Sequence, residues 1–190
     1  MRVIHVVPAV TEEASGPSYS VTRLCESLIA TGTDVRLAAL DWAHMPVRPG
    51  YLTSFPLGWG PRRLGVSPQM NRWLEDEVAS GKNDIVHNHS LWMMPNVYSG
   101  WACRAGRCRL VVSPRGTLSR WAFGRNRLQR EIFWRLMQRP AIAQADCFHA
   151  TAESEYEDIR RLGFRQPVCI LSNGIDLPPL KRESDGGRRQ

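Results

Sequence analysis

Two histidines stand two residues apart near the end of a short apolar run. The segment from Asp84 to Trp92 contains both His87 and His89. Side chains two apart on a strand project to the same side, with His89 nearer the strand's end. There an imidazole can take a proton from a hydroxyl or hydrogen-bond to a phosphate or sugar oxygen. The alternative is that one of them is a hydrogen-bonded core histidine, which is favoured for His87 over His89. A metal site is not expected, because the sequence has no third ligand at a suitable spacing.

An arginine and a glycine follow the next apolar run. Arg115 stands after Ser113 and Pro114 and is followed directly by Gly116. A guanidinium at a sheet edge can hold a phosphate through two parallel hydrogen bonds, and the glycine leaves room for a ligand. An ion pair between Arg115 and a carboxylate of the protein explains the residue equally well. Both interpretations stay open from the residues alone.

A third polar segment opens the first predicted helix, from Ser15 to Ser20. Gly16 lets the backbone turn closely, Pro17 fits the first helical position, and the unpaired N–H groups beyond it form an anion site. The segment matches neither the dinucleotide fingerprint nor a P-loop. Taken alone, a glycine before a helix more often marks a simple turn.

Alternating strands and helices must position these residues. Apolar runs predict strands at 3–10, 35–40, 85–89, 110–113, 147–151 and 168–171. Helical patterns lie between them, at 17–30, after Ser67, after Pro95, within 126–145 and after Thr151. This order predicts an α/β fold with a doubly wound, mainly parallel, Rossmann-like sheet. Ligands of such sheets bind beyond the carboxyl ends of the strands, so Gly16, His89 and Arg115 should converge on one rim.

Length and composition predict one domain, residues 1–176, followed by a disordered tail or truncated linker at 177–190. The 190 residues contain no apolar run long enough to span a membrane and no export signal, which favours a cytoplasmic protein. Residues 41–66 form a long irregular stretch, which indicates a functional or mobile loop. The net charge of +7 comes almost wholly from arginine and suits anionic surfaces, although a GC-rich genome would give the same bias.

Aromatic residues and arginines alternate between 119 and 139. Such a segment can lie on an anionic membrane, which would place the protein peripherally at the inner face. The favoured alternative is a solvated helix whose aromatic face packs on the sheet. Nucleic acid is excluded as a partner because no reader motif is present.

Taken together, these segments resemble the N-terminal domain of family 4 glycosyltransferases, which have the GT-B fold. The resemblance runs from Val3 to about Asp176, and its order and spacing are more specific than any one motif. It rests on the segments 15–17, 84–92, 113–116, 145–155 and 172–176.

The resemblance implies retaining sugar transfer from a nucleotide-sugar donor, without a cofactor or obligatory metal. It assigns Gly16, Pro17 and Ser18 to the loop that approaches the donor phosphates. It assigns the acceptor-side cleft to the following residues: His89, Trp92, Arg115 and Gly116. The acceptor would be a glycan or a lipid-linked sugar, in bacterial surface polysaccharide or lipopolysaccharide synthesis.

Four features depart from the family pattern. Ser15 replaces one of two loop glycines, Arg115 stands where relatives often carry histidine, and Ala152 leaves Thr151 as the expected helix cap. In relatives, the turn at Asn173 leads into a second α/β domain that holds the nucleotide. We therefore expect little transfer by this chain alone unless a second polypeptide supplies that half. The alternative is a non-catalytic Rossmann-like binding module, either a decayed fragment or one subunit of a split enzyme.

Overall fold

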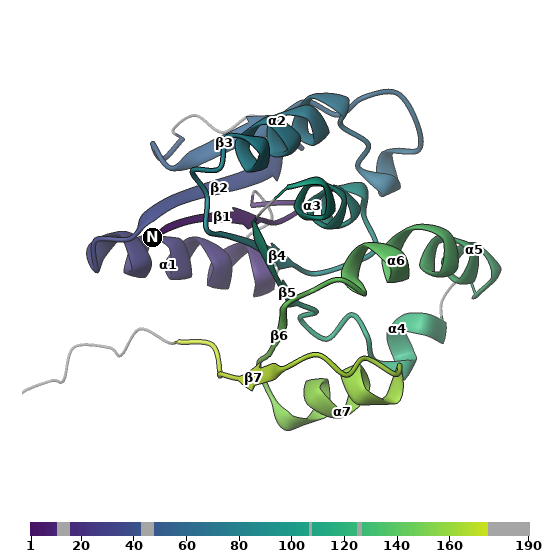
Figure 1. Cartoon of the computed structure of the whole chain (residues 1–190). Helices are drawn as coiled ribbons and strands as arrows, with labels where there is room; N and C mark the ends of the chain where they lie inside the picture. The colour runs from purple at the N-terminus through teal and green to yellow at the C-terminus, as the bar shows by residue number, and fades with distance from the viewer. Residues whose placement is uncertain (11–15, 43–47, 107, 125–126, 175–190) are drawn as a thin grey trace, which may run out of the picture.

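Seven parallel strands form the sheet at the centre of the protein (Figure 1). The computed structural model describes residues 1–10, 16–42, 48–106, 108–124 and 127–174. The strand order is β3-β2-β1-β4-β5-β6-β7, and every neighbouring pair is parallel. The strands are β1 (Arg2–Val6), β2 (Asp34–Leu40), β3 (Leu52–Phe55), β4 (Ile85–His89), β5 (Arg109–Ser113), β6 (Cys147–Ala150) and β7 (Val168–Ile170). The predicted α/β fold with a Rossmann-like parallel sheet is confirmed.

Helices cover both faces of the sheet. Figure 1 shows α1 on one side and α2 and α3 on the other. The helices and helical turns are α1 (Gly16–Ala30), η1 (Arg62–Leu64), α2 (Pro68–Ala79), α3 (Met94–Ala105), α4 (Arg120–Gly124), α5 (Arg127–Phe133), η2 (Trp134–Gln138), α6 (Arg139–Ile142) and α7 (Glu153–Arg161). The start of α2 follows directly from sequence: Ser67 caps it through the backbone N–H of Met70, and Pro68 takes the first helical position.

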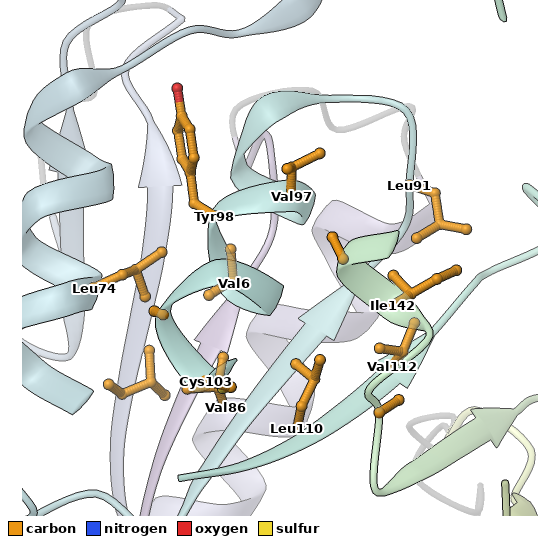
Figure 2. Close-up of a cluster of buried hydrophobic side chains, with 14 of the residues drawn as sticks. Val6, Leu74, Val86, Leu91, Val97, Tyr98, Cys103, Leu110, Val112 and Ile142 are labelled. Carbon is orange, nitrogen blue, oxygen red and sulfur yellow. The ribbon is translucent and has the colours of Figure 1, made fainter. Parts of the chain in front are cut away.

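Strand residues alternate between two apolar clusters. Val6, Val86 and Leu110 face the larger cluster, in which they meet side chains of α2 and α3 (Figure 2). Leu37 and Ala39 face the smaller cluster under α1. Burial on both faces explains why these strands appear in the sequence as continuous apolar runs.

The sheet also brings α3 and α6 into close contact. Gly100 of α3 lies against the backbone of Ala141 in α6, where a Cβ atom would collide with the carbonyl group. Glycine at this position therefore sets how closely the two helices approach.

The longer helical segment expected within 126–145 is present at 127–142, and it contains the π-helical turn η2 just before Pro140, which has no N–H to donate to the carbonyl of Leu136. Two local predictions were wrong. The stretch 41–66 is not wholly irregular, because it contains the short edge strand β3 and the turn η1. Finally, Ala152 rather than Thr151 is the N-cap of α7, and its side chain makes no cap hydrogen bond. The predicted tail, 177–190, lies outside the described residues.

Candidate functional site at the carboxyl edge of the sheet

Backbone strain gathers at the carboxyl edge of β4 and β5. Among the described residues, the non-glycine positions with positive φ are Ser90, Trp92 and Arg115, at 66°, 80° and 56°. Each follows one of these two strands within three residues. A bulky residue such as tryptophan rarely adopts this conformation, which costs about 1–3 kcal/mol and recurs at ligand sites. The strain marks this edge as a candidate site.

Arg115 lies at this edge, and its guanidinium contacts two uncharged side chains. Its Nη1 donates to the side-chain oxygen of Asn173, and its Nη2 lies 3.4 Å from Nδ1 of His89. No carboxylate among the described residues forms a salt bridge with it. Burial lowers the pKa of Arg115, and the nearby Glu155 charge opposes that shift. Of the two interpretations left open by the sequence, the ion pair with a carboxylate is therefore not found within the described residues.

Glu155 supports the loop that carries Arg115. Its buried carboxylate accepts hydrogen bonds from the backbone N–H groups of Gly116 and Thr151 and from the Thr151 hydroxyl. The Gly116 N–H is therefore already used within the protein. Gly116 itself has a φ of 75°, and no atom lies within 4 Å of where its Cβ would be. It contributes a left-handed turn and open space beside Arg115.

Three histidines lie together beneath Arg115. His5 of β1 pairs in register with His87 of β4, and the rings of His87 and His89 are 4.0 Å apart. His89 is completely buried and His87 only partly, the reverse of the burial expected from sequence. The reason is that the Arg115 loop lies over His89, at the end of the strand. His87 and His89 do project to the same side, as predicted.

All three imidazoles are uncharged at neutral pH. Burial, and secondarily the Arg115 charge, lowers the pKa of His5 from 6.5 to about 4. Burial also lowers the pKa of His87 and His89 well below the ordinary value, with neighbouring histidines as the next cause. Desolvation opposes the charged form of an imidazole, so these rings are neutral hydrogen-bonding groups.

The contact with Arg115 fixes where the protons of two histidines lie. A guanidinium only donates, so Nδ1 of neutral His89 accepts and its proton is on Nε2. That Nε2 donates to Nδ1 of His5 across 2.9 Å. His5 therefore carries its proton on Nε2, a buried atom with no hydrogen-bond partner among the described residues.

A second chain of hydrogen bonds runs across β5 and β6. The Nε2 of His149 donates to the carbonyl of Leu171 across 2.9 Å. Its Nδ1 therefore accepts from the hydroxyl of Ser113, at 2.8 Å, when the ring is neutral. Ser113 in turn accepts from Nε2 of His87, at 2.7 Å. Together, the two series of hydrogen bonds link β1, β4, β5 and β6 near the edge that carries Arg115.

The sequence spacing indicated no third histidine for a metal, yet the fold supplies His5. One ring nitrogen from each of His5, His87 and His89 lies within 4.8 Å of the others. A cation here would stand beside the Arg115 guanidinium, and both nitrogens of His89 already take part in hydrogen bonds, to Arg115 and to His5. These contacts favour a hydrogen-bonded cluster over a metal centre.

The predicted donor-phosphate loop lies at the same edge of β1. The Ser18 hydroxyl donates to the carbonyl of Ala9, just beyond β1, and Ser18 is buried. Gly16 is the first residue of α1 and lies in open space, and Pro17 follows it. Within the described residues, the hydrogen bonds of this segment go to Ala9 and to α1 itself. Among the described residues, no hydrogen bond joins Gly16 to His89 or Arg115, so a shared site for the three stays a prediction.

Trp92 faces away from the histidines. Its backbone N–H donates to the Gln138 side chain at 2.9 Å, and its indole N–H donates to the carbonyl of Thr117 at 2.9 Å. Its ring packs edge-on against Phe123 and near Trp134, so part of the aromatic face of 119–139 does pack inward. Trp92 therefore connects the Arg115 loop to the helical segment that follows it.

Sequence reasoning missed three residues of this site. His5 stands within the first apolar run, and only the register of β1 with β4 brings it to His87. Asn173, three residues beyond the end of β7, and Glu155 of α7 reach the site from far away in sequence. His5 could have been found as a histidine within an otherwise apolar strand, and Glu155 and Asn173 stand in two segments that carry the family resemblance, 145–155 and 172–176.

The fold is a Rossmann-like unit with a candidate ligand site at the carboxyl ends of its strands. The chain belongs to Glycosyltransferase Family 4, whose family model matches residues 14–178. No curated protein sequence matches the chain.

Solved structures match the fold at low sequence identity. HepE from Anabaena, in complex with UDP and glucose, has a TM-score of 0.62 and 12% identity over 93% of this chain and 45% of its own. Sucrose-phosphate synthase from Thermosynechococcus elongatus has a TM-score of 0.62 and 16% identity over 93% and 49%. MnaA from S. aureus, solved with UDP, has a TM-score of 0.60 and 13% identity over 90% and 45%.

This chain therefore spans slightly less than half the length of each of these structures. It corresponds to one half of a GT-B fold. Across the described residues, none of the helices has both the length and the apolar character needed to cross a bilayer.

Proposed function

We propose that this chain is the acceptor-side half of a retaining glycosyltransferase that uses a nucleotide-sugar donor. The observation that carries the proposal is Arg115, a cation without an ion pair among the described residues, held on strained backbone at the carboxyl edge. Such a cation suits the phosphate of a nucleotide sugar or of an acceptor. The proposed setting is bacterial surface polysaccharide or lipopolysaccharide synthesis.

The contacts suggest a division of roles. Arg115 would bind the anionic group, and His89 would orient the guanidinium through its neutral Nδ1. Gly116 would provide space rather than an N–H donor, because Glu155 already accepts from that N–H. Trp92 would form a wall of the cleft, since its indole N–H is bonded to Thr117.

The α1 end would approach the donor from the opposite side of the cleft. Gly16, Pro17 and Ser18 form its first turn, where backbone N–H groups favour an anion. The Ser18 hydroxyl proton is directed at Ala9, so only its oxygen lone pairs and its backbone N–H remain for a ligand. The second α/β half would complete the donor site, whether it lies in the same polypeptide or in another.

Sugar transfer with both halves present tests this proposal. The chain is co-expressed with the product of the reading frame that follows it, and the lysate fraction is incubated with a panel of sugar nucleotides and glycan or lipid acceptors. We expect transfer from one donor, with much less transfer by the 190-residue chain alone. Absence of transfer from every donor in the panel would contradict the proposal.

A matched pair of arginine variants tests the role of the edge. Arg115→Gln should lower kcat/KM about 10- to 100-fold, the range for losing a charge-assisted hydrogen bond. Arg109→Gln is the control, because Arg109 begins the same strand and its exposed side chain pairs with Asp146 at the other edge of the sheet. Equal effects of the two substitutions would refute the assignment of Arg115.

A further inference from the structure

Three aliphatic side chains form a stripe on the outward side of α5 and η2. Leu128 and Ile132 of α5 and Leu136 of η2 follow each other at intervals of four and are 75%, 51% and 71% exposed. Residues four apart lie on the same side of a helix. The aromatic side chain of Trp134, by contrast, is buried. This segment therefore keeps an aromatic residue inside and presents an aliphatic stripe to its surroundings, which is typical of an interaction surface.

The loop 58–66 carries a second exposed apolar side chain. The loop is closed by the hydrogen bond from the N–H of Gly58 to the carbonyl of Val66, at 2.6 Å. Trp59, just inside this closure, is 97% exposed. Tryptophan is enriched where a bilayer meets water, because its ring is apolar and its N–H is polar. A tryptophan at the start of a closed loop fits such a boundary.

The loop and the stripe border one cavity. Arg63 and Leu64 of the loop line it on one side, and Ile132 and Leu136 of the stripe line it on the other. The cavity has a volume of about 710 Å³, and its wall is mainly apolar. Two segments that are far apart in sequence thus meet on one side of the protein. We call the loop 58–66 and the three residues of the stripe the apolar face.

The charge of the loop favours an anionic lipid surface. Arg62 and Arg63 are both exposed, and the loop 58–66 contains no acidic residue. Neither arginine forms a salt bridge within the described residues. Arg62 instead donates to the carbonyl of Trp42 at 3.3 Å and lies over its ring, so its charge is not neutralised. Cations beside exposed apolar side chains are typical of surfaces that bind anionic membranes.

We propose that the apolar face binds the surface of a membrane that contains anionic lipid. Trp59 and the aliphatic stripe would enter the boundary of the acyl chains, and Arg62 and Arg63 would lie at the level of the lipid phosphates. The inference goes beyond the proposed function and does not rest on it, because it concerns a lipid surface rather than a donor or an acceptor.

Charge argues against a second copy of the chain as the occupant. In a two-fold dimer the same face of both copies would meet, and the arginines of each loop would need carboxylates on the other. The acidic residue of α5, Glu131, is already paired with Arg135 at 2.6 Å. Lipid phosphates provide the anions that this face does not offer to itself.

Flotation of the 190-residue chain with lipid vesicles tests the proposal without a donor or an acceptor. Vesicles of phosphatidylcholine are compared with vesicles in which about a third of the lipid is phosphatidylglycerol. We expect binding to the anionic vesicles to be at least about tenfold tighter and to weaken as salt is added. Equal binding to both kinds of vesicle, or no binding to either, would overturn the proposal.

Two matched pairs of variants locate the surface. Leu136→Glu should weaken binding to anionic vesicles about tenfold, because a carboxylate would have to enter the lipid boundary. Ile29→Glu makes the same change of charge on α1, which lies at the other end of the molecule from α5 (Figure 1), and should change binding less than twofold. Arg63→Gln should weaken binding about fivefold, whereas Arg104→Gln, in the last turn of α3, should change it less than twofold.

Equal effects within either pair would place the lipid surface elsewhere and overturn the proposal. The four substituted side chains are exposed, so the fold should tolerate each change. Sedimentation velocity gives the remaining outcome. Self-association of the chain that Leu136→Glu abolishes, without binding to vesicles, would assign the apolar face to a second copy and would also overturn the proposal.

Discussion

Acidification should destabilise this protein through its buried histidines, and His5 gives the magnitude. Its pKa is lowered from 6.5 to about 4 in the folded chain, chiefly by burial. Between these two values the unfolded chain binds more protons than the folded chain, so the free energy of unfolding falls as pH falls. The stabilisation is complete above about pH 6.5 and is lost by about pH 4. The full loss is roughly 3 kcal/mol, of which about 1.2 kcal/mol is lost between pH 7 and pH 5.5.

The change His5→Leu isolates this contribution. At pH 7 the variant should be less stable by about 1–3 kcal/mol, because Nε2 of His89 loses the acceptor it now has. Between pH 7 and pH 5.5, the free energy of unfolding of the variant should fall by about 1.2 kcal/mol less than that of the unchanged protein. His87 and His89 have lowered pKa values too, so both proteins should still lose stability in acid.

Urea unfolding at the two pH values measures these differences. Val86→Ala is the control, because Val86 is fully buried in the neighbouring strand and carries no titratable group. This substitution should lower the free energy of unfolding by about 2 kcal/mol at pH 7 and by the same amount at pH 5.5. If His5→Leu and Val86→Ala showed the same pH dependence, His5 would not be a neutral buried group and the assignment of protons in the cluster would fail.

Two further substitutions test the packing and the edge loop. Gly100→Ala should lower the free energy of unfolding by about 1–3 kcal/mol, because the new methyl group meets the Ala141 carbonyl; an unchanged urea midpoint would show that α3 and α6 separate easily. Glu155→Gln should cost about 1–3 kcal/mol, because the amide's NH₂ replaces one oxygen that accepts from Gly116 or Thr151. Hydrogen exchange at those two amides should quicken, and unchanged exchange rates would argue against this support.

Much of the fold could be predicted because strands that are buried on both faces of a sheet have continuous apolar runs in the amino-acid sequence. The run at 85–89 coincides with β4, and the Ser67-Pro68 start of α2 was found from its cap alone. The edge strand β3 was missed because only Phe55 of its four residues is buried, so it has no such run. The π-helical turn before Pro140 was missed because helical periodicity does not distinguish a widened turn from a regular one.

The candidate site could be predicted only in part. The rule that ligands bind at the carboxyl ends of parallel strands predicted that His89 and Arg115 share one edge. In the structure, Nη2 of Arg115 lies 3.4 Å from Nδ1 of His89. The same rule says nothing of partners that arrive through register, such as His5, or through a later helix, such as Glu155. It also does not predict that His89 is buried, because the Arg115 loop and His5 of β1 both contact the His89 ring.

The loop after β4 depends on the helical segment η2 for its strained conformation. Trp92 holds a left-handed backbone conformation that costs about 1–3 kcal/mol, and its N–H is held by Gln138, which is buried within η2. A regular α-helical turn before Pro140 would present the Gln138 side chain in a different direction. The widened turn therefore supports the strained loop, and the indole of Trp92 in turn bonds to the carbonyl of Thr117 in the loop that carries Arg115. A change in η2 would thus be transmitted to the Arg115 edge through Trp92.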